Sequence, residues 1–112
     1  MKVKIEEKYQ AAIIELKGSL IGGENAKLFR DKLYTLIKDG KKKVVVDMTD
    51  VKFVNSTGIG ILISGYTTLK NAGGDLKLAH ISDKVEGVLN ITKLIQIFNI
   101  YNNVDEAVKS FS

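Results

Sequence analysis

The sequence has no cysteine, a single histidine, and no uninterrupted apolar run of the roughly 18 residues that a membrane span needs. Without cysteine the chain can form no disulfide, supply no catalytic thiolate and bind no metal through sulfur. A serine–histidine triad would depend on His80, but the G-x-S-x-G elbow is missing and no orienting acid is evident after that histidine. A hydrolase of this kind is therefore not indicated.

Arginine is almost as rare, because Arg30 is one of 17 basic residues and the others are all lysine. Since side chains that read DNA bases are often arginine, we expect no nucleic-acid partner. The formal net charge of +4 is only mildly basic. Lys38 and the lysines at 41–43 form the densest basic cluster. Such a cluster is compatible with a phosphate-binding patch and also with a solvated turn that guards the start of a buried strand.

Apolar residues make up 45% of the chain and charged residues 27%, which is typical of a soluble globular protein. A length of 112 residues suits one domain, which we expect to span residues 1–112. Residues 1–10 alternate charged with apolar side chains and lack the apolar core of a signal peptide. We therefore expect a cytoplasmic monomer without direct membrane insertion.

The hydrophobic periodicity predicts an α/β chain that begins with two strands and then alternates helix and strand. The link between strands 3–8 and 11–17 is too short for a crossover, so these strands should pair antiparallel. The later alternation favours parallel strands, and so a single mixed sheet with helices packed on it. A loop is predicted at 18–23, and helices are predicted at 25–38, 56–71 and 83–90, with a final helix after Asn103. The remaining strands, which are either alternating or apolar, are predicted at 43–48, 75–80 and 96–101. Two of these helices have capping-box spacing at their starts, Asp83 with Glu86 and Asn103 with Glu106.

Ser56 opens the helix predicted at 56–71, directly after an apolar strand-like run that ends at Asn55. The helix should bury one apolar stripe and turn the opposite side outward, next to the loop at 18–23. Ser56 is open to two interpretations, as a simple N-cap or as a regulatory switch. The residues expected in the buried stripe are Ile59, Leu62, Ile63, Tyr66 and Leu69, and those expected outside are Thr57, Gly60, Ile61 and Ser64.

A phosphate on Ser56 would lie near free backbone N–H groups and the positive end of the helix dipole, where an anion is tolerated. Phosphorylation adds about −1.5 to −2 charges at neutral pH. Opposite a partner's carboxylate at about 4 Å, each unit charge costs on the order of 4 kcal/mol at an effective dielectric constant near 20. A switch that leaves the fold intact and releases a partner is therefore physically available.

Asp47 and Asp50 are the most enzyme-like pair, at the expected end of a buried strand. Carboxylates in that position can bind Mg²⁺ or accept a phosphoryl group. The more common role for such an aspartate is to accept hydrogen bonds from loop backbone amides. We therefore interpret the chain as non-enzymatic, with the metal-dependent alternative open to a metal titration.

The stretch "VVVDMTDVKFVNSTGIGILISGYTTLKNAGGDLKLAH" resembles the core of a STAS domain of the anti-sigma factor antagonist (anti-anti-sigma factor) family. The likeness covers nearly the whole chain. It includes the G-S-L after the second strand, the D-x-x-x-V-x-F-x-x-S-x-G-x-G block and the late "LNITKLIQIFNIYNNVDEAV". The S-x-G-x-G block after a buried strand and an aspartate is specific to this family.

The resemblance implies a partner-switching regulator. Its unphosphorylated form would bind a serine kinase that doubles as an anti-sigma factor, and phosphorylation of the serine matching Ser56 would release it. A serine phosphatase would reset the switch, and since ATP is bound by the kinase this chain would need no cofactor. Thr57 is an alternative acceptor beside Ser56. The implied partner contacts are Ser19, Leu20, Ile21, Asn55, Thr57, Gly58, Gly60, Ile61 and Ser64.

The chain departs from the family pattern at two places. Asn55 stands where an aspartate often precedes the serine, and Ser19-Leu20-Ile21-Gly22 replaces a loop that often carries an acidic residue. A second hypothesis is a STAS subunit that only docks, within a signalling scaffold or a lipid-transport complex. In that case Ser56 would be an N-cap and would carry no phosphate, so phosphorylation distinguishes the two hypotheses.

Overall fold

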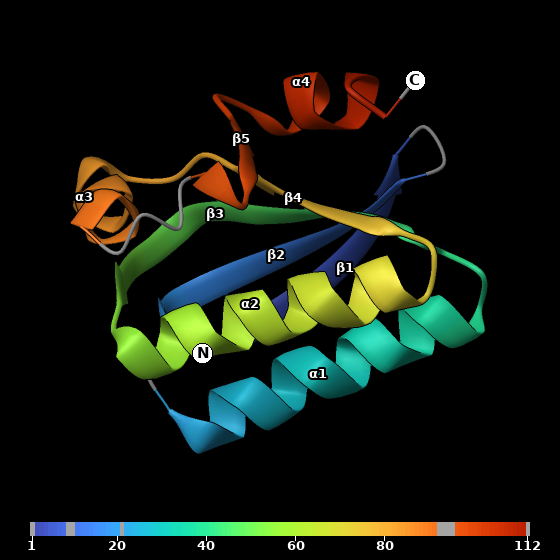
Figure 1. Ribbon diagram of the computed structural model, residues 1–112, viewed down its shortest axis with the longest axis horizontal. Coiled ribbons are helices and arrows are strands. Elements are labelled where there is room, and N and C mark those ends of the chain that lie inside the picture. Colours follow the sequence, from blue (N-terminus) through green and yellow to red (C-terminus); the bar gives the residue numbers. More distant parts are fainter. Residues whose placement is uncertain (1, 9–10, 21, 92–95, 112) are drawn as a thin grey trace.

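A computed structural model of the chain describes residues 2–8, 11–20, 22–91 and 96–111. Its five strands form one sheet in which the order across the sheet, β1-β2-β3-β4-β5, is also the order along the chain (Figure 1). Strand β1 pairs antiparallel with β2, and all later neighbours pair parallel. The predicted mixed sheet opened by a hairpin is confirmed. The strands are β1 (Lys2–Lys8), β2 (Ala11–Leu20), β3 (Lys43–Val54), β4 (Asp75–Ala79) and β5 (Asn99–Tyr101).

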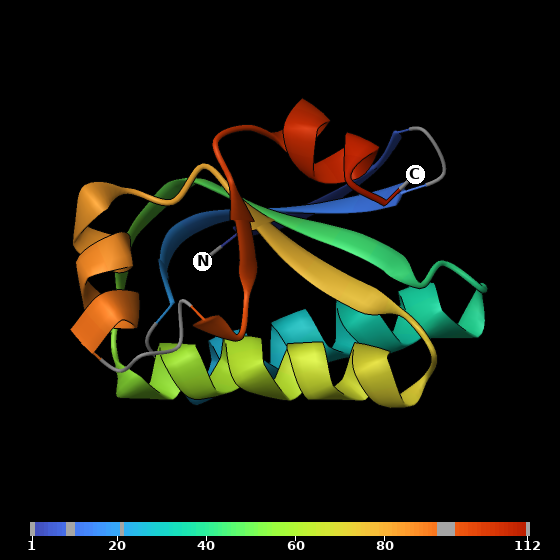
Figure 2. The same cartoon turned by 45° about the horizontal axis from the view of Figure 1, so that its top comes forward.

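The helices are α1 (Gly23–Lys38), α2 (Ser56–Asn71), α3 (Asp83–Ile91) and α4 (Val104–Lys109). Helices α1 and α2 lie side by side on one face of the sheet, whereas α4 covers the other face (Figures 1 and 2). Helix α3 lies at one end of the sheet (Figure 1). The bounds of α2 are those predicted from the sequence, because both its apolar spacing and the Ala72-Gly73-Gly74 stop are strong local signals.

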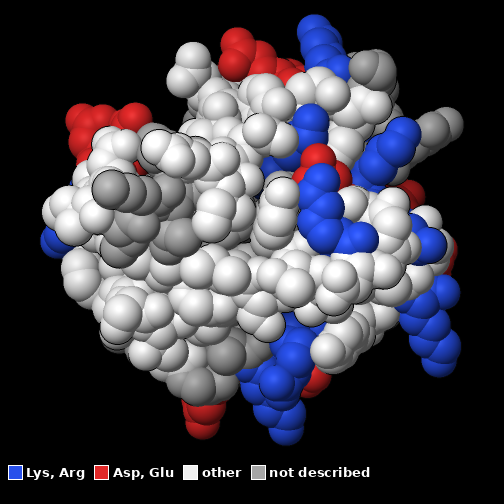
Figure 3. Space-filling model, viewed as in Figure 1, with Lys and Arg blue, Asp and Glu red and all other residues white. Residues whose placement is uncertain are grey.

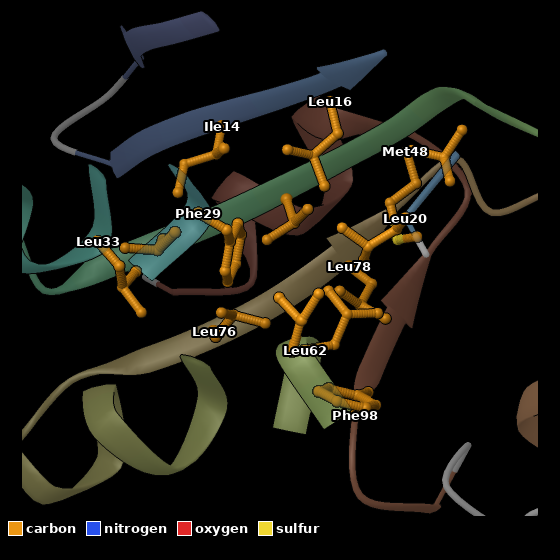
Figure 4. Packing of buried hydrophobic residues seen from close by; sticks show 14 of the residues in the cluster. Ile14, Leu16, Leu20, Phe29, Leu33, Met48, Leu62, Leu76, Leu78 and Phe98 are labelled. Carbon is orange, nitrogen blue, oxygen red and sulfur yellow. The ribbon is translucent and has the colours of Figure 1, made fainter. Parts of the chain in front are cut away.

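Strand β3 connects the two layers of the core because its consecutive valines point to opposite faces. Val44 and Val46 pack into the larger cluster, on the side of α1 and α2, and Val45 packs into the smaller one under α4. Figure 4 shows the larger cluster, in which Phe29 and Leu33 of α1 and Leu62 of α2 meet side chains of the sheet. This packing fixes α2, and with it Ser56, against the sheet.

The loop predicted at 18–23 is wrong for its first half, since β2 continues through Leu20. The pairing of β2 with β3 shifts register between Gly18 and Ser19, and Gly18 has a φ of 107°. A glycine in this conformation lets the strand bend and go on, which a sequence pattern does not distinguish from its end. The last strand is shorter than predicted, because only Asn99–Tyr101 pairs with β4. The expected link at Tyr9-Gln10 lies outside the described residues.

Strand β4 does not have the half-exposed character that its alternation predicts, because helices cover both of its faces. Lys77 is only 6% exposed. Its ammonium lies 4.3 Å from the ring centroid of Phe111 and 5.3 Å from that of Tyr101, and it donates to the Ser110 hydroxyl. Aromatic rings and a hydroxyl are favourable surroundings for a cation. They come from β5 and from the two residues after α4, so Lys77 helps hold the C-terminal helix on the sheet.

The caps of the last two helices differ from each other. At α4 the Asn103 Oδ1 accepts from the Glu106 N–H at 2.8 Å, so the predicted N-cap there is confirmed. At α3 the cap is Ser82, whose hydroxyl accepts from the Val85 N–H at 3.2 Å, and Asp83 is the first helical residue. The predicted capping residue, Asp83, lies one residue after the actual cap. Serine and aspartate are both good caps, and here they stand next to each other.

Candidate functional site

The candidate site is the junction where β3 ends and α2 begins. Asn55 has an extended backbone, with φ −99° and ψ −173°, and its Oδ1 accepts from the Gly58 N–H at 2.9 Å. Its carbonyl oxygen accepts the first helical hydrogen bond, from the Ile59 N–H at 2.9 Å. Asn55 is therefore the N-cap of α2, and the interpretation of Ser56 as the cap is wrong.

Ser56 is the first residue of α2, and its side chain is exposed. Because Asn55 does the capping, the Ser56 hydroxyl makes no hydrogen bond to any residue that the structure describes. The first turn of α2 carries no acidic residue, so the positive end of the helix dipole has no side-chain anion beside it. A hydroxyl in this position can be reached by a kinase and can carry a phosphate without disturbing the cap.

Gly58 holds the first turn of α2 against the end of β2. An added Cβ at this position would lie 1.9 Å from the carbonyl oxygen of Leu20 and 2.9 Å from Cγ1 of Val54. The same end of β2 also anchors α1, because the Asn25 side chain donates to the Ser19 carbonyl at 2.9 Å. The starts of both helices are thus fixed on one strand end.

Several of the residues predicted to contact a partner are buried. Leu20 and Gly58 are buried where α2 packs on the end of β2, so neither residue can touch a partner directly. Ile61 was expected to face outward and is only 7% exposed. The reason is that α1 packs beside α2 and covers the flank that carries Ile61, whereas periodicity predicts only the stripe that faces the sheet.

The exposed members of the predicted set are Thr57, Gly60 and Ser64, which follow one another along the outer side of α2. Asn55 and Ser19 are half-buried, and Ile21 lies outside the described residues. Together with Ser56, the three exposed residues form a surface without charge, which we call the α2 face. Phe53 was not singled out from the sequence, because it lies within an apolar run. It is 37% exposed, with the Lys84 ammonium 5.0 Å from its ring centroid.

Asp47 and Asp50 line one surface hollow, together with Glu15. Asp47 lies within β3 instead of at its end, and its Oδ1 accepts from the Thr49 N–H at 3.1 Å and from the Thr49 hydroxyl. His80 lines a surface hollow with Ser82 and Glu86 that does not include Ser56. Among the described residues no three His, Asp or Glu side chains are grouped so as to hold a metal ion. No helix in the described part of the chain has the length and apolarity to cross a membrane.

Comparison with known proteins decides the family. Residues 2–107 match the model of the STAS domain. The chain belongs to the STAS domain family. The resemblance drawn from the S-x-G-x-G block is thereby confirmed.

Two sequence relatives and one solved structure illustrate the relationship. This STAS domain is 30% identical over 87 residues, 77% of each chain, to a Thermotoga maritima protein provisionally assigned as an anti-sigma factor antagonist. It is 29% identical over 104 residues to the anti-sigma-B factor antagonist of Bacillus subtilis, covering 89% of this chain and 92% of that one. A crystal structure of a Thermotoga maritima protein with the same provisional assignment has a TM-score of 0.86 at 26% identity, covering 96% of this chain and 92% of that one.

Asn55 offers a first test of the geometry of this STAS domain. Asn55→Ala removes the acceptor of the Gly58 N–H and should lower the free energy of unfolding by about 1 kcal/mol. Asn55→Asp keeps an acceptor and adds a negative charge at the helix start, so it should be neutral or stabilising by about 0.3–1 kcal/mol. Urea unfolding of the three proteins measures both values. Equal stability of Asn55→Ala and the wild type would contradict the assignment of the cap.

Proposed function

We propose that this STAS protein is an anti-sigma factor antagonist that works by partner switching, with Ser56 as its phosphorylation site. Unphosphorylated, it binds a serine kinase that doubles as an anti-sigma factor, and the sigma factor is freed. Phosphorylation of Ser56 releases the kinase, and a serine phosphatase restores the binding form. The observation that carries the proposal is the exposed Ser56 hydroxyl, next to the Asn55 cap and within the family's S-x-G-x-G block.

The position of Ser56 accounts for a switch that leaves the fold unchanged. A phosphate there lies at the positive end of the α2 dipole, where an anion is stabilising or neutral. The same phosphate adds roughly two negative charges to the otherwise uncharged α2 face. A partner that packs on this face is lost through repulsion and desolvation, while the domain remains folded.

The proposed contact surface consists of the α2 face together with Asn55, Ser19 and the segment at Ile21. The role is regulatory and not catalytic, and the phosphoryl group comes from ATP on the kinase. The protein therefore needs no cofactor of its own. The proposal also takes it as a cytoplasmic monomer that does not insert into a membrane. The names of the two sequence relatives support this role, since both are anti-sigma factor antagonists or provisionally assigned as such.

The test is phosphorylation of the purified protein by Mg-ATP and a lysate of its native cells, followed by mapping of phosphopeptides. We expect one phosphate, on Ser56, and a loss of essentially all label in Ser56→Ala. Thr57→Ala removes the neighbouring exposed hydroxyl of the α2 face, and its phosphate should still map to Ser56.

Label that survives in Ser56→Ala and disappears in Thr57→Ala would transfer the site to Thr57. An unlabelled wild type, in a lysate that labels its other substrates, would reject the switch. That outcome would favour the alternative role of a STAS subunit that only docks.

A further inference from the structure

A narrow surface hollow of about 50 Å³ lies between α1 and α2. Its floor includes Phe29 and Leu33 of α1 and Gly65 of α2, where an added Cβ would lie 2.7 Å from the Phe29 ring. Its rim includes Arg30 on α1 and Ser64 on α2. One water needs about 10–15 Å³, so the tip of a partner's side chain fits in this hollow. The rim residue Ser64 belongs to the α2 face, which joins the hollow to Ser56.

Arg30 lines the hollow, and Tyr34 stands next to it on α1 without lining the hollow itself. Arg30 is the chain's only arginine, is exposed, and forms no ion pair with a described residue. Tyr34 stands one turn later on the same side of α1 and is 52% exposed. Arginine and tyrosine are the residue types in which protein interfaces concentrate binding energy. We call Arg30, Tyr34 and the hollow beside them the α1–α2 groove.

The charges around the groove specify the partner's chemistry. Helix α2 carries no charged residue before Lys70, and Figure 3 shows the surface over α2 as a broad uncharged band with basic side chains next to it over α1. Lys27, one turn before Arg30, is exposed and adds a second positive charge on that side. Asp31 is rotated by about 100° around the helix from Arg30. Asp31 lies one turn after Lys27, so Arg30 is the cation that the groove offers to a partner with no acid one turn away along the helix.

We propose that the α1–α2 groove docks an acidic segment of the kinase, with a carboxylate on Arg30 and a neighbouring side chain in the hollow. This inference rests on the proposed function, because the same partner must reach Ser56. Along α2 the rise from Ser56 to Ser64 is about 12 Å. That distance exceeds the Debye length of roughly 8–10 Å at physiological salt, so a charge at Ser56 is largely screened from one at the hollow. The contact at Arg30 therefore adds affinity for the kinase, and release comes from the repulsion at Ser56 itself.

The experiment measures the initial rate of Ser56 phosphorylation by native lysate and Mg-ATP, at protein concentrations where the rate is proportional to substrate. Arg30→Glu should lower this rate at least about tenfold, since reversing a charge in a complementary interface weakens association. Arg30→Lys should retain most of the rate, because the charge remains and only the planar fork is lost. Arg30→Gln, without a reversed charge, should fall in between.

Lys32→Glu is the matched control. It makes the same charge change on an exposed residue of the same helix, about 200° around the axis from Arg30. Its rate should stay within about twofold of the wild type, and thermal unfolding should show that all variants remain folded. Wild-type rates for Arg30→Glu and Arg30→Gln would reject the groove and leave the proposed function standing. Equal slowing by Lys32→Glu would reject it too, as an effect of net charge. An unlabelled wild type would reject both proposals.

Discussion

Replacing Gly58 with alanine is expected to lower the free energy of unfolding by about 3 kcal/mol, against a typical total of about 5–15 kcal/mol. The added Cβ would lie 1.9 Å from the Leu20 carbonyl oxygen, which is backbone and cannot rotate away. The clash is relieved only if the first turn of α2 moves away from the end of β2. For a domain of this size the loss corresponds to a fall in Tm of roughly 10–15 °C, measurable by circular dichroism or calorimetry.

Gly60→Ala is the matched control for this prediction. Gly60 lies in the same helix and is exposed, and nothing stands within 4 Å of an added Cβ. Since alanine favours a helix over glycine, this variant should gain about 0.5–1 kcal/mol. The two alanines should therefore shift Tm in opposite directions. A Gly58→Ala protein as stable as the wild type would show that α2 does not press on β2 as described.

Ser56→Asp is expected to weaken binding to the kinase without lowering the stability of the fold. One negative charge at about 4 Å from a partner's carboxylate costs on the order of 4 kcal/mol at an effective dielectric constant near 20. The affinity for the kinase should therefore fall by roughly 10²–10³-fold. The free energy of unfolding should be unchanged or higher by about 0.3–1 kcal/mol, because the charge lies at the positive end of α2. Titration calorimetry with the kinase, purified by its Ser56-labelling activity, measures the affinity.

Asn71→Asp controls for the added charge. It places the same charge at the exposed far end of the same helix, about 22 Å from position 56, and should leave the affinity within about twofold. An equal loss of affinity in both variants would mean that net charge, and not the position of Ser56, governs the complex. Full affinity in Ser56→Asp would contradict release by repulsion.

The parts of the fold set by local signals could be predicted from the sequence. Helix α2 has both a strong apolar period and a glycine stop, and its bounds were predicted without error. Asn103 was identified as a cap because only one good capping residue stands at the required spacing from Glu106. At α3 the spacing to Glu86 indicated Asp83, whereas the neighbouring Ser82 is the cap.

What could not be predicted depends on neighbours that are distant in the sequence. The burial of Ile61 results from α1, and that of Lys77 partly from Phe111, which follows α4. The extension of β2 past Gly18 needs the register of β3 to reveal it. For the candidate site, the motif indicated Ser56, but the cap on Asn55 and the groove beside Arg30 appear only when the helices are packed.

The order of the strands bears on how the domain is made. Each strand pairs with the strand that precedes it in the chain, so no strand has to be inserted between two that have already formed. Contacts between segments close in sequence favour fast folding. The sheet can therefore form from one edge during synthesis on the ribosome. Each new segment then docks on a strand that has already formed. On this route the helix that carries Ser56 docks before the last strand emerges, and a chain stalled late in synthesis would already present it.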